Sequence, residues 1–184
     1  MSDLSATWHA EHANFARLLD LLERQVAAFQ AGEQPNYDLM LDIIHYLRNY
    51  PDRVHHPQEN VAFARLLERD STLKPQIDRL LQEHRVIAAA GSKLLEHLDA
   101  VVAGALEPRS IVEAAAATYL TYFRQHMATE DKEVIPRAVQ LLTAQDWAAV
   151  AAAVPAGPDP LLGDDIEARY RTLRRQIAFD SQSG

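Results

Sequence analysis

Cysteine is absent from the 184-residue chain. Its absence excludes disulfide bonds, thiolate zinc sites, thiolate-held iron–sulfur clusters and cysteine nucleophiles. The chain also lacks an apolar run long enough to span a bilayer and the charged-then-apolar start of a signal peptide, so we expect a cytoplasmic protein with no membrane partner. The formal net charge of −8 argues against a nucleic-acid partner, because a phosphate backbone attracts basic surfaces.

Glycine is scarce too, with six residues, and no segment has the apolar–polar alternation of a half-buried strand. Stretches rich in Ala, Leu, Glu, Arg and Gln instead place apolar side chains three and four residues apart, which is typical of amphipathic helices. Breaks at 32–35, 70–72 and 104–108 separate four long helical segments. Because the connections are short, we predict an all-α fold, an antiparallel up-down four-helix bundle over residues 1–142.

A C-terminal helical extension, residues 143–184, is predicted to pack on or beside this bundle. Thr143 with Asp146 indicates a capping box at the start of a short helix, and residues 164–178 form a last amphipathic helix. Interior prolines predict kinks or breaks in the second and fourth long segments. They are Pro51, Pro57 and Pro136.

Four of the eight histidines fall at matching depths in the predicted bundle. In an antiparallel hairpin, two residues lie at the same depth when they are equidistant from the turn. The midpoints of successive pairs of these histidines fall at the three predicted breaks. This places four imidazoles in one layer, each on a different helical segment. They are His12, His55, His84 and His126.

Two of these histidines have a glutamate four residues later, which is about one helical turn, so each pair shares a helix face. Four imidazoles and two carboxylates without sulfur suit iron, manganese or zinc, and two carboxylates can bridge a pair of metals. The predicted metal ligands are His12, His55, Glu59, His84, His126 and Glu130. The alternative is that they are buried polar residues that satisfy one another, or His–Glu pairs on a solvated face. Burial without a ligand would cost about 1–3 kcal/mol per group, which favours the metal site.

Other polar residues near this layer are placed by helix geometry. His9 lies one turn before the first predicted ligand and could reach the site from its edge. His56 points about 100° away from the ligand that it follows, and the adjacent proline leaves its direction open. Glu11 and Glu83 each directly precede a predicted ligand, and the same divergence between neighbours predicts that both carboxylates lie in solvent.

These residues carry a resemblance to a known family. Glu11-His12, the stretch DRVHHPQENVAFARLL, Glu83-His84 and the stretch FRQHMATEDKEVIP resemble the hemerythrin-like HHE cation-binding domains of bacteria, over roughly residues 5–140. The resemblance implies a hemerythrin-like bundle with a non-haem di-iron centre. It also implies that the six predicted ligands hold the two irons and that the two glutamates bridge them.

The chain departs from the oxygen-carrying members in two places. Those proteins have a second histidine one turn after the third-helix ligand, and here that residue is Ala88. The fourth-helix carboxylate fits best at Glu130, although Asp131 has the five-residue spacing of the oxygen carriers. Together with an oxo or hydroxo bridge, the six ligands leave one open position on each iron. We expect water, His9, His56 or an exogenous molecule to fill these positions.

Three functions compete at this point. The first is a di-iron protein that binds or senses dioxygen or nitric oxide, with small anions as further ligands. The second is a di-iron redox enzyme or an iron-handling or repair protein, acting on peroxide, nitric oxide or ferrous iron; because cysteine is absent, its electrons would pass through tyrosines or an external partner. The third is a structural bundle with zinc or no metal. Only the first two give a coloured protein.

Overall fold

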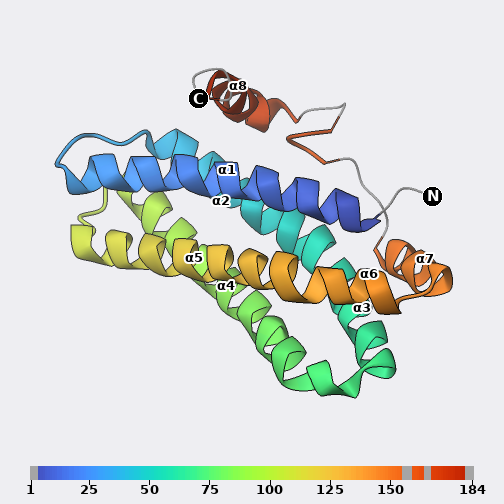
Figure 1. The fold of residues 1–184 in the computed structure, drawn as a ribbon. Helices are drawn as coiled ribbons and strands as arrows, with labels where there is room; N and C mark the ends of the chain where they lie inside the picture. Colours follow the sequence, from blue (N-terminus) through green and yellow to red (C-terminus); the bar gives the residue numbers. More distant parts are fainter. Residues whose placement is uncertain (1–3, 155–158, 164–166, 181–184) are drawn as a thin grey trace.

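The computed structural model describes residues 4–154, 159–163 and 167–180. Within these residues all regular elements are helical, and four long helical segments form a bundle. In chain order they are α1 (Leu4–Gln30), α2–η1–α3 (Tyr37–Tyr50, Pro51–His55 and His56–Arg69), α4 (Lys74–Val102) and α5–η3–α6 (Arg109–Thr129, Glu130–Val134 and Ile135–Leu141). Figure 1 shows α1 and α5 side by side in opposite directions, with α2, α3 and α4 behind them. The predicted all-α bundle is confirmed.

The turns between the segments lie where the sequence predicts them. Gly32 and Gly104, each two residues beyond the end of α1 or α4, adopt positive φ angles of 82° and 84°, a conformation that glycine adopts without steric cost. Asn36 caps α2, because its side chain accepts a hydrogen bond from the backbone N–H of Leu39. Asp70 caps the short helix η2 (Ser71–Leu73) in the same way. The described helices include none that is long and apolar enough to cross a membrane.

Two prolines inside the long segments widen the helix for one turn and do not end it. The residue before each proline donates its N–H to the carbonyl five residues earlier: His56 to Pro51, and Ile135 to Glu130. A proline ring crowds the carbonyl four residues before it and supplies no N–H, so the chain accommodates it through the π-turns η1 and η3. Each π-turn contains a predicted ligand, His55 in η1 and Glu130 in η3.

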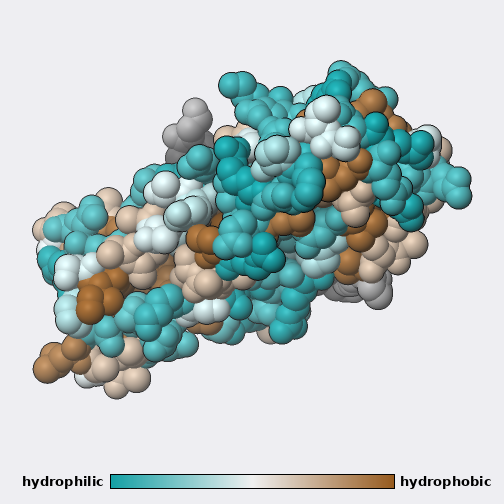
Figure 2. Space-filling view, turned by 90° about the horizontal axis from the view of Figure 1, so that it is seen from below, coloured by the Kyte–Doolittle hydropathy of each residue, from teal (hydrophilic) through white to brown (hydrophobic). Residues whose placement is uncertain are grey.

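The core consists of two apolar clusters with a polar layer between them. On α1, His12 lies between Trp8 of one cluster and Phe15 of the other, and all three side chains are buried. On α4, the buried His84 likewise lies between Leu80 and Ile87. The polar layer is therefore enclosed at both ends by hydrophobic packing. The outer surface differs from this core: the face in Figure 2 is mostly hydrophilic with small, separate apolar patches.

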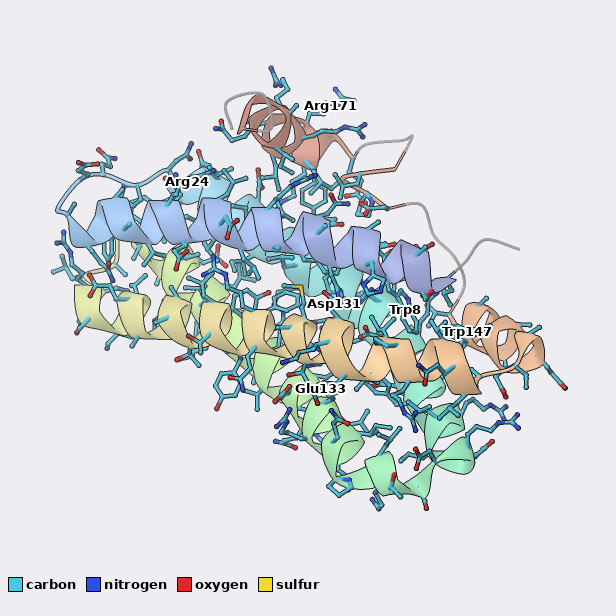
Figure 3. The ribbon with its side chains drawn as sticks, in the orientation of Figure 1. Trp8, Arg24, Asp131, Glu133, Trp147 and Arg171 are labelled. Atoms are coloured by element: carbon cyan, nitrogen blue, oxygen red, sulfur yellow. The ribbon has the colours of Figure 1, made fainter. Side chains whose placement is uncertain are left out.

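Beyond the bundle, α7 (Ala144–Ala153) begins with the predicted capping box, in which Thr143 and Asp146 exchange hydrogen bonds. Helix α7 packs on α3, and Trp147 meets Trp8 edge to face with ring centroids 5.6 Å apart (Figure 3). The turn η4 (Ala168–Tyr170) leads into the last helix, α8 (Arg171–Asp180), which packs near α2. Glu167 is not helical and residues 168–170 form the turn η4, so the predicted helix is wrong over 167–170; its predicted first residues, 164–166, lie outside the described residues.

Candidate metal centre

The six predicted ligands converge in the polar layer. Each of them is at most 7% exposed, and the side chains come from α1, η1, α3, α4, α5 and η3. The Nε2 atoms of His55 and His126 lie 3.0 and 3.1 Å from the Oε1 atoms of Glu59 and Glu130. The Nε2 atoms of His12 and His55 lie 2.9 Å apart. All four predicted histidines direct Nε2 toward Glu59 or Glu130.

The imidazoles form two groups that share the two carboxylates. We call His12 and His55 the α1 half, and His84 and His126 the α4 half. Glu59 places Oε1 3.0 Å from His55 Nε2 and 3.6 Å from His12 Nε2, and it places Oε2 3.4 Å from His84 Nε2. Glu130 also presents one oxygen to each half. Its Oε2 lies 3.7 Å from His12 Nε2, while its Oε1 faces His126 and His84. Each carboxylate thus presents one oxygen to each half, as a ligand that bridges two cations would.

Buried atoms without partners provide a test of whether these residues fit a metal. Both carboxylate oxygens of Glu59 and Glu130 and the Nε2 atoms of His84 and His126 have no hydrogen-bond partner among the described residues. Leaving a buried polar atom unpaired costs about 1–3 kcal/mol, and such atoms are rare in native proteins. Here they point toward one another, and imidazole nitrogen with carboxylate oxygen is a donor set that suits iron, manganese or zinc. The residues fit a metal site.

The outward nitrogen of each imidazole has an oxygen partner. The Nδ1 contacts are His12 with Asp131 at 2.8 Å, His55 with Glu11 at 2.6 Å, His84 with Asn60 at 2.9 Å and His126 with Glu83 at 3.2 Å. In a metal-bound imidazole, an oxygen acceptor at Nδ1 holds the proton there and leaves the Nε2 lone pair for the cation. Metal-ligating histidines are commonly oriented in this way, so the surroundings of the layer also favour a metal.

Two of these outward partners correct the sequence prediction. Glu11 and Glu83 do not lie free in solvent: Glu83 is 8% exposed, and Glu11 also accepts a hydrogen bond from Tyr50 at 2.7 Å. Adjacent residues do diverge by about 100°, but each helix of a bundle has two neighbours. A carboxylate beside a ligand histidine therefore reaches the ligand on the next helix. An acidic residue directly before a predicted ligand is the signal that could have identified both.

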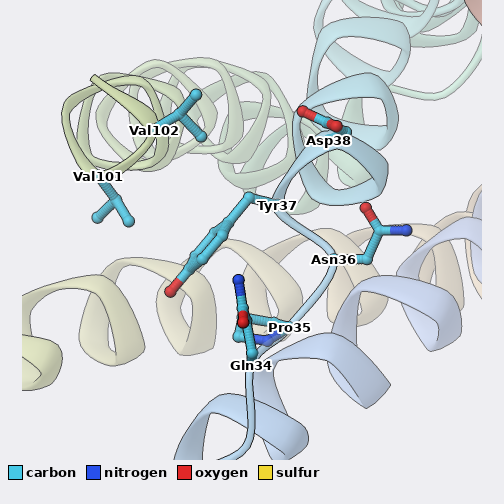
Figure 4. A pocket seen from close by; sticks show the side chains of 7 residues that line it. All are labelled: Gln34, Pro35, Asn36, Tyr37, Asp38, Val101 and Val102. Atoms are coloured by element: carbon cyan, nitrogen blue, oxygen red, sulfur yellow. The ribbon is translucent and has the colours of Figure 1, made fainter. Parts of the chain in front are cut away.

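Three residues whose role the sequence left open are now placed. Asp131 is not directed into the layer; its Oδ1 contacts the Nδ1 atoms of His9 and His12, both at 2.8 Å. His9 is about half exposed, with a side-chain exposure of 48%, and lies outside the layer. His56 is 4% exposed, and its ring stacks on His84 with centroids 4.2 Å apart. The pocket in Figure 4 lies elsewhere, between the α1–α2 turn and the end of α4, and no predicted ligand lines it.

The pKa values of the buried histidines and glutamates depend on burial and on the charges of one another. Burial by itself would lower the pKa of the imidazoles, but nearby carboxylates outweigh it and raise the pKa of His12 to about 9 and of His55 and His126 to about 10. Burial would raise the pKa of Glu59, yet the surrounding imidazoles hold it well below its usual range. Without a cation, the layer therefore keeps protons on histidine. A bound metal would replace those protons.

A helical bundle that gathers imidazoles and carboxylates in its core belongs to the class of metal-binding four-helix proteins. Residues 3–138 match the family model of the hemerythrin HHE cation-binding domain, and the chain belongs to this family. No curated protein and no solved structure matches the chain. The match ends within α6, so α7 and α8 lie beyond it.

Proposed function

We propose that the protein binds two iron ions in the polar layer and uses them to bind or sense dioxygen or nitric oxide. The observation that carries this proposal is the disposition of Glu59 and Glu130. All four of their oxygens lack hydrogen-bond partners among the described residues, and each carboxylate faces both halves of the layer. The proposed ligands are His12, His55, Glu59, His84, His126 and Glu130. Manganese and zinc are the alternative metals for this donor set.

When bound, paired irons supply a redox-active centre with open coordination positions for a diatomic ligand. The chain's own residues orient the donors and exclude water. Glu11, Asp131, Asn60 and Glu83 fix the imidazole rings through Nδ1. Aromatic rings enclose the layer: Phe15 lies 5.2 Å from His55, and Phe63 lies 6.1 Å from His84, both between ring centroids. Such apolar walls limit the access of solvent to a metal site.

A second candidate, a redox enzyme, is favoured by a line of tyrosines that leads away from the layer. Tyr50 donates to Glu11, which in turn contacts His55 Nδ1. The ring of Tyr46 stacks on that of Tyr50 with centroids 5.9 Å apart, and its hydroxyl donates a hydrogen bond to Asp159 at 2.8 Å. Both phenols thus have a carboxylate that can accept a proton, as a path for coupled electron and proton transfer requires. Turnover of peroxide by the iron-loaded protein would favour this candidate over simple ligand binding.

Metal analysis with an absorption spectrum tests the proposal. We expect protein loaded with ferrous iron and then exposed to air to hold two irons per chain and to show absorption bands that azide shifts. The iron-loaded protein, kept free of oxygen, should bind nitric oxide. Zinc-loaded protein is the matched blank, because zinc is colourless. A colourless protein that retains only zinc or no metal, or bands that neither ligand changes, would contradict the proposal.

A further inference from the structure

His56 has the same two-sided environment as the four predicted ligand histidines. Its side chain is 5% exposed, and its Nδ1 lies 3.3 Å from Asp52 Oδ1. Its Nε2 is buried and has no hydrogen-bond partner among the described residues. An unpaired buried nitrogen costs free energy unless something occupies it. An outward carboxylate together with an inward free Nε2 is the arrangement that prepares an imidazole for a metal.

The His56 ring belongs to the α4 half. It lies nearly parallel to His84 with an interplanar angle of 19°, and it meets His126 edge to face with centroids 5.6 Å apart. Candidate ligand atoms of His56, Glu59, His84 and His126 all lie within 4.8 Å of one another. A second group of this kind consists of His12, His55 and Glu59. The adjacent histidines therefore serve different halves, and Glu59 belongs to both.

Neighbouring residues can serve two halves because of where their helical segment lies. The segment α2–η1–α3 packs against α1 on one side and α4 on the other. Side chains that diverge by about 100° can therefore reach both neighbours while both remain inside the bundle. The π-turn η1 ends at His55, so His56 begins the next α-helix, with Glu59 one turn further. One segment thereby supplies a ligand to each half and a carboxylate between them.

We infer that His56 is a fifth imidazole ligand and completes the coordination of the metal in the α4 half, where Ala88 provides no histidine. This inference rests on the proposed function, because it presupposes two metals in the layer. It makes the halves unequal, with three imidazoles on one metal and two on the other. The single open position then lies on the α1 half, where Phe15 and Trp8 pack against His55.

Nitrogen NMR of the zinc-loaded protein, with nitrogen-15-labelled histidine, tests the ligand directly, because zinc is diamagnetic. We expect five Nε2 signals to shift to metal-bound values on loading, and His56→Ala to remove one of them. Four shifted signals with His56 unchanged would overturn the inference and leave the proposed function intact. No shifted signal and no retained metal would instead contradict the proposed function. This measurement on the parent protein does not depend on the folding of a variant.

Azide titration of the iron-loaded protein provides the second readout. We expect one azide per centre in the parent and two in His56→Ala and His56→Phe; the phenylalanine keeps a ring against His84 but offers no nitrogen. Both variants should also release one of their two irons to a chelator at least about tenfold faster. His97→Ala is the matched control, because His97 is a partly buried histidine paired with Glu107 at 3.1 Å, away from the layer. One azide per centre and parental release in both variants would overturn the inference.

Discussion

The two halves of the polar layer share Glu59 and Glu130 but differ in what supports their imidazoles. In the α1 half, His12 and His55 both contact carboxylates, Asp131 and Glu11. In the part of the chain that the structure describes, neither carboxylate pairs with an arginine: Glu11 accepts from Tyr50, and Asp131 is shared with His9.

In the α4 half, the outward partners carry less free charge. His84 contacts the neutral amide of Asn60. The carboxylate behind His126, Glu83, lies 3.4 Å from Arg79, and the carboxylate behind His56, Asp52, lies 3.6 Å from Arg48. A carboxylate partner increases the basicity of an imidazole, and a nearby guanidinium reduces that influence. With the inferred ligand His56 counted in the α4 half, the α1 half thus has fewer imidazoles with stronger partners. Residues outside the layer therefore make its two positions chemically unequal.

The largest expected effect comes from removing a carboxylate that both halves share. Glu59→Ala and Glu130→Ala should each leave a protein that holds at most one metal tightly, since each glutamate presents an oxygen to both halves. Elemental analysis after gel filtration gives the number of metals per chain and checks this expectation. Glu133→Ala is the control, because Glu133 is an exposed glutamate in the same turn η3 (Figure 3). Two irons and a parental spectrum in both variants would remove these residues from the ligand set.

The pH dependence of stability should separate the metal-free from the metal-loaded layer. A histidine with a folded-state pKa near 9 or 10, as for His12, His55 and His126, stabilises the fold fully below its unfolded value of 6.5 and loses this contribution as pH rises through the folded value. The free energy of unfolding of metal-free protein should therefore fall between pH 7 and 10, by about 1.4 kcal/mol per pH unit for each proton involved.

Metal-loaded protein should behave differently over the same range, because its ligands carry no protons to lose. Its stability should stay level above about pH 7 and fall on acidification, when protons compete with the metal. Urea unfolding at several pH values, with and without a chelator, measures both curves. Parallel curves for the two forms would contradict a metal held by these histidines.

The layer itself could be predicted from the sequence, but its surroundings could not. Equal distances from three turns place His12, His55, His84 and His126 at one depth, and helical spacing adds Glu59 and Glu130. These arguments require only regular helices and short turns, and the structure brings the six residues together. That they bind metal stays a prediction.

The positions of Glu11, Glu83 and His56 depend on which neighbouring helix each flank of a segment faces. That is a property of the packed bundle, and the spacing within one helix does not contain it. The π-turns could not be predicted either. A proline inside a helix can cause a kink, a break or a π-turn, and the packing of the segment selects one of these. Over 168–170 the short turn η4 lies where the sequence predicted α-helix, so α8 begins at Arg171.

A change confined to the α1 half should weaken metal binding without abolishing it. Glu11→Gln keeps the size of the side chain and removes the charge that faces His55 Nδ1 at 2.6 Å. Losing such a partner typically reduces metal affinity about 10–100-fold, so we expect one of the two metals to be held that much more weakly. Chelator competition monitored by absorption gives both affinities. Glu107→Gln is a suitable control, since Glu107 contacts His97 outside the layer. Equal weakening of both metals would mean that the halves do not respond separately.

The smallest effect is expected from the reverse change in the α4 half. Asn60→Asp places a carboxylate where an amide oxygen now lies 2.9 Å from His84 Nδ1, which makes this half resemble the other. The imidazole becomes more basic and binds its metal more tightly. Because Asn60 is exposed, solvent screens the added charge, so we expect a gain of only about two- to fivefold in affinity. The same chelator competition detects it, and in the double variant with Glu11→Gln the two affinities should change in opposite directions. Weaker binding in Asn60→Asp would mean that the partner of His84 acts by geometry and not by charge, and the electrostatic difference between the halves would then not explain their chemistry.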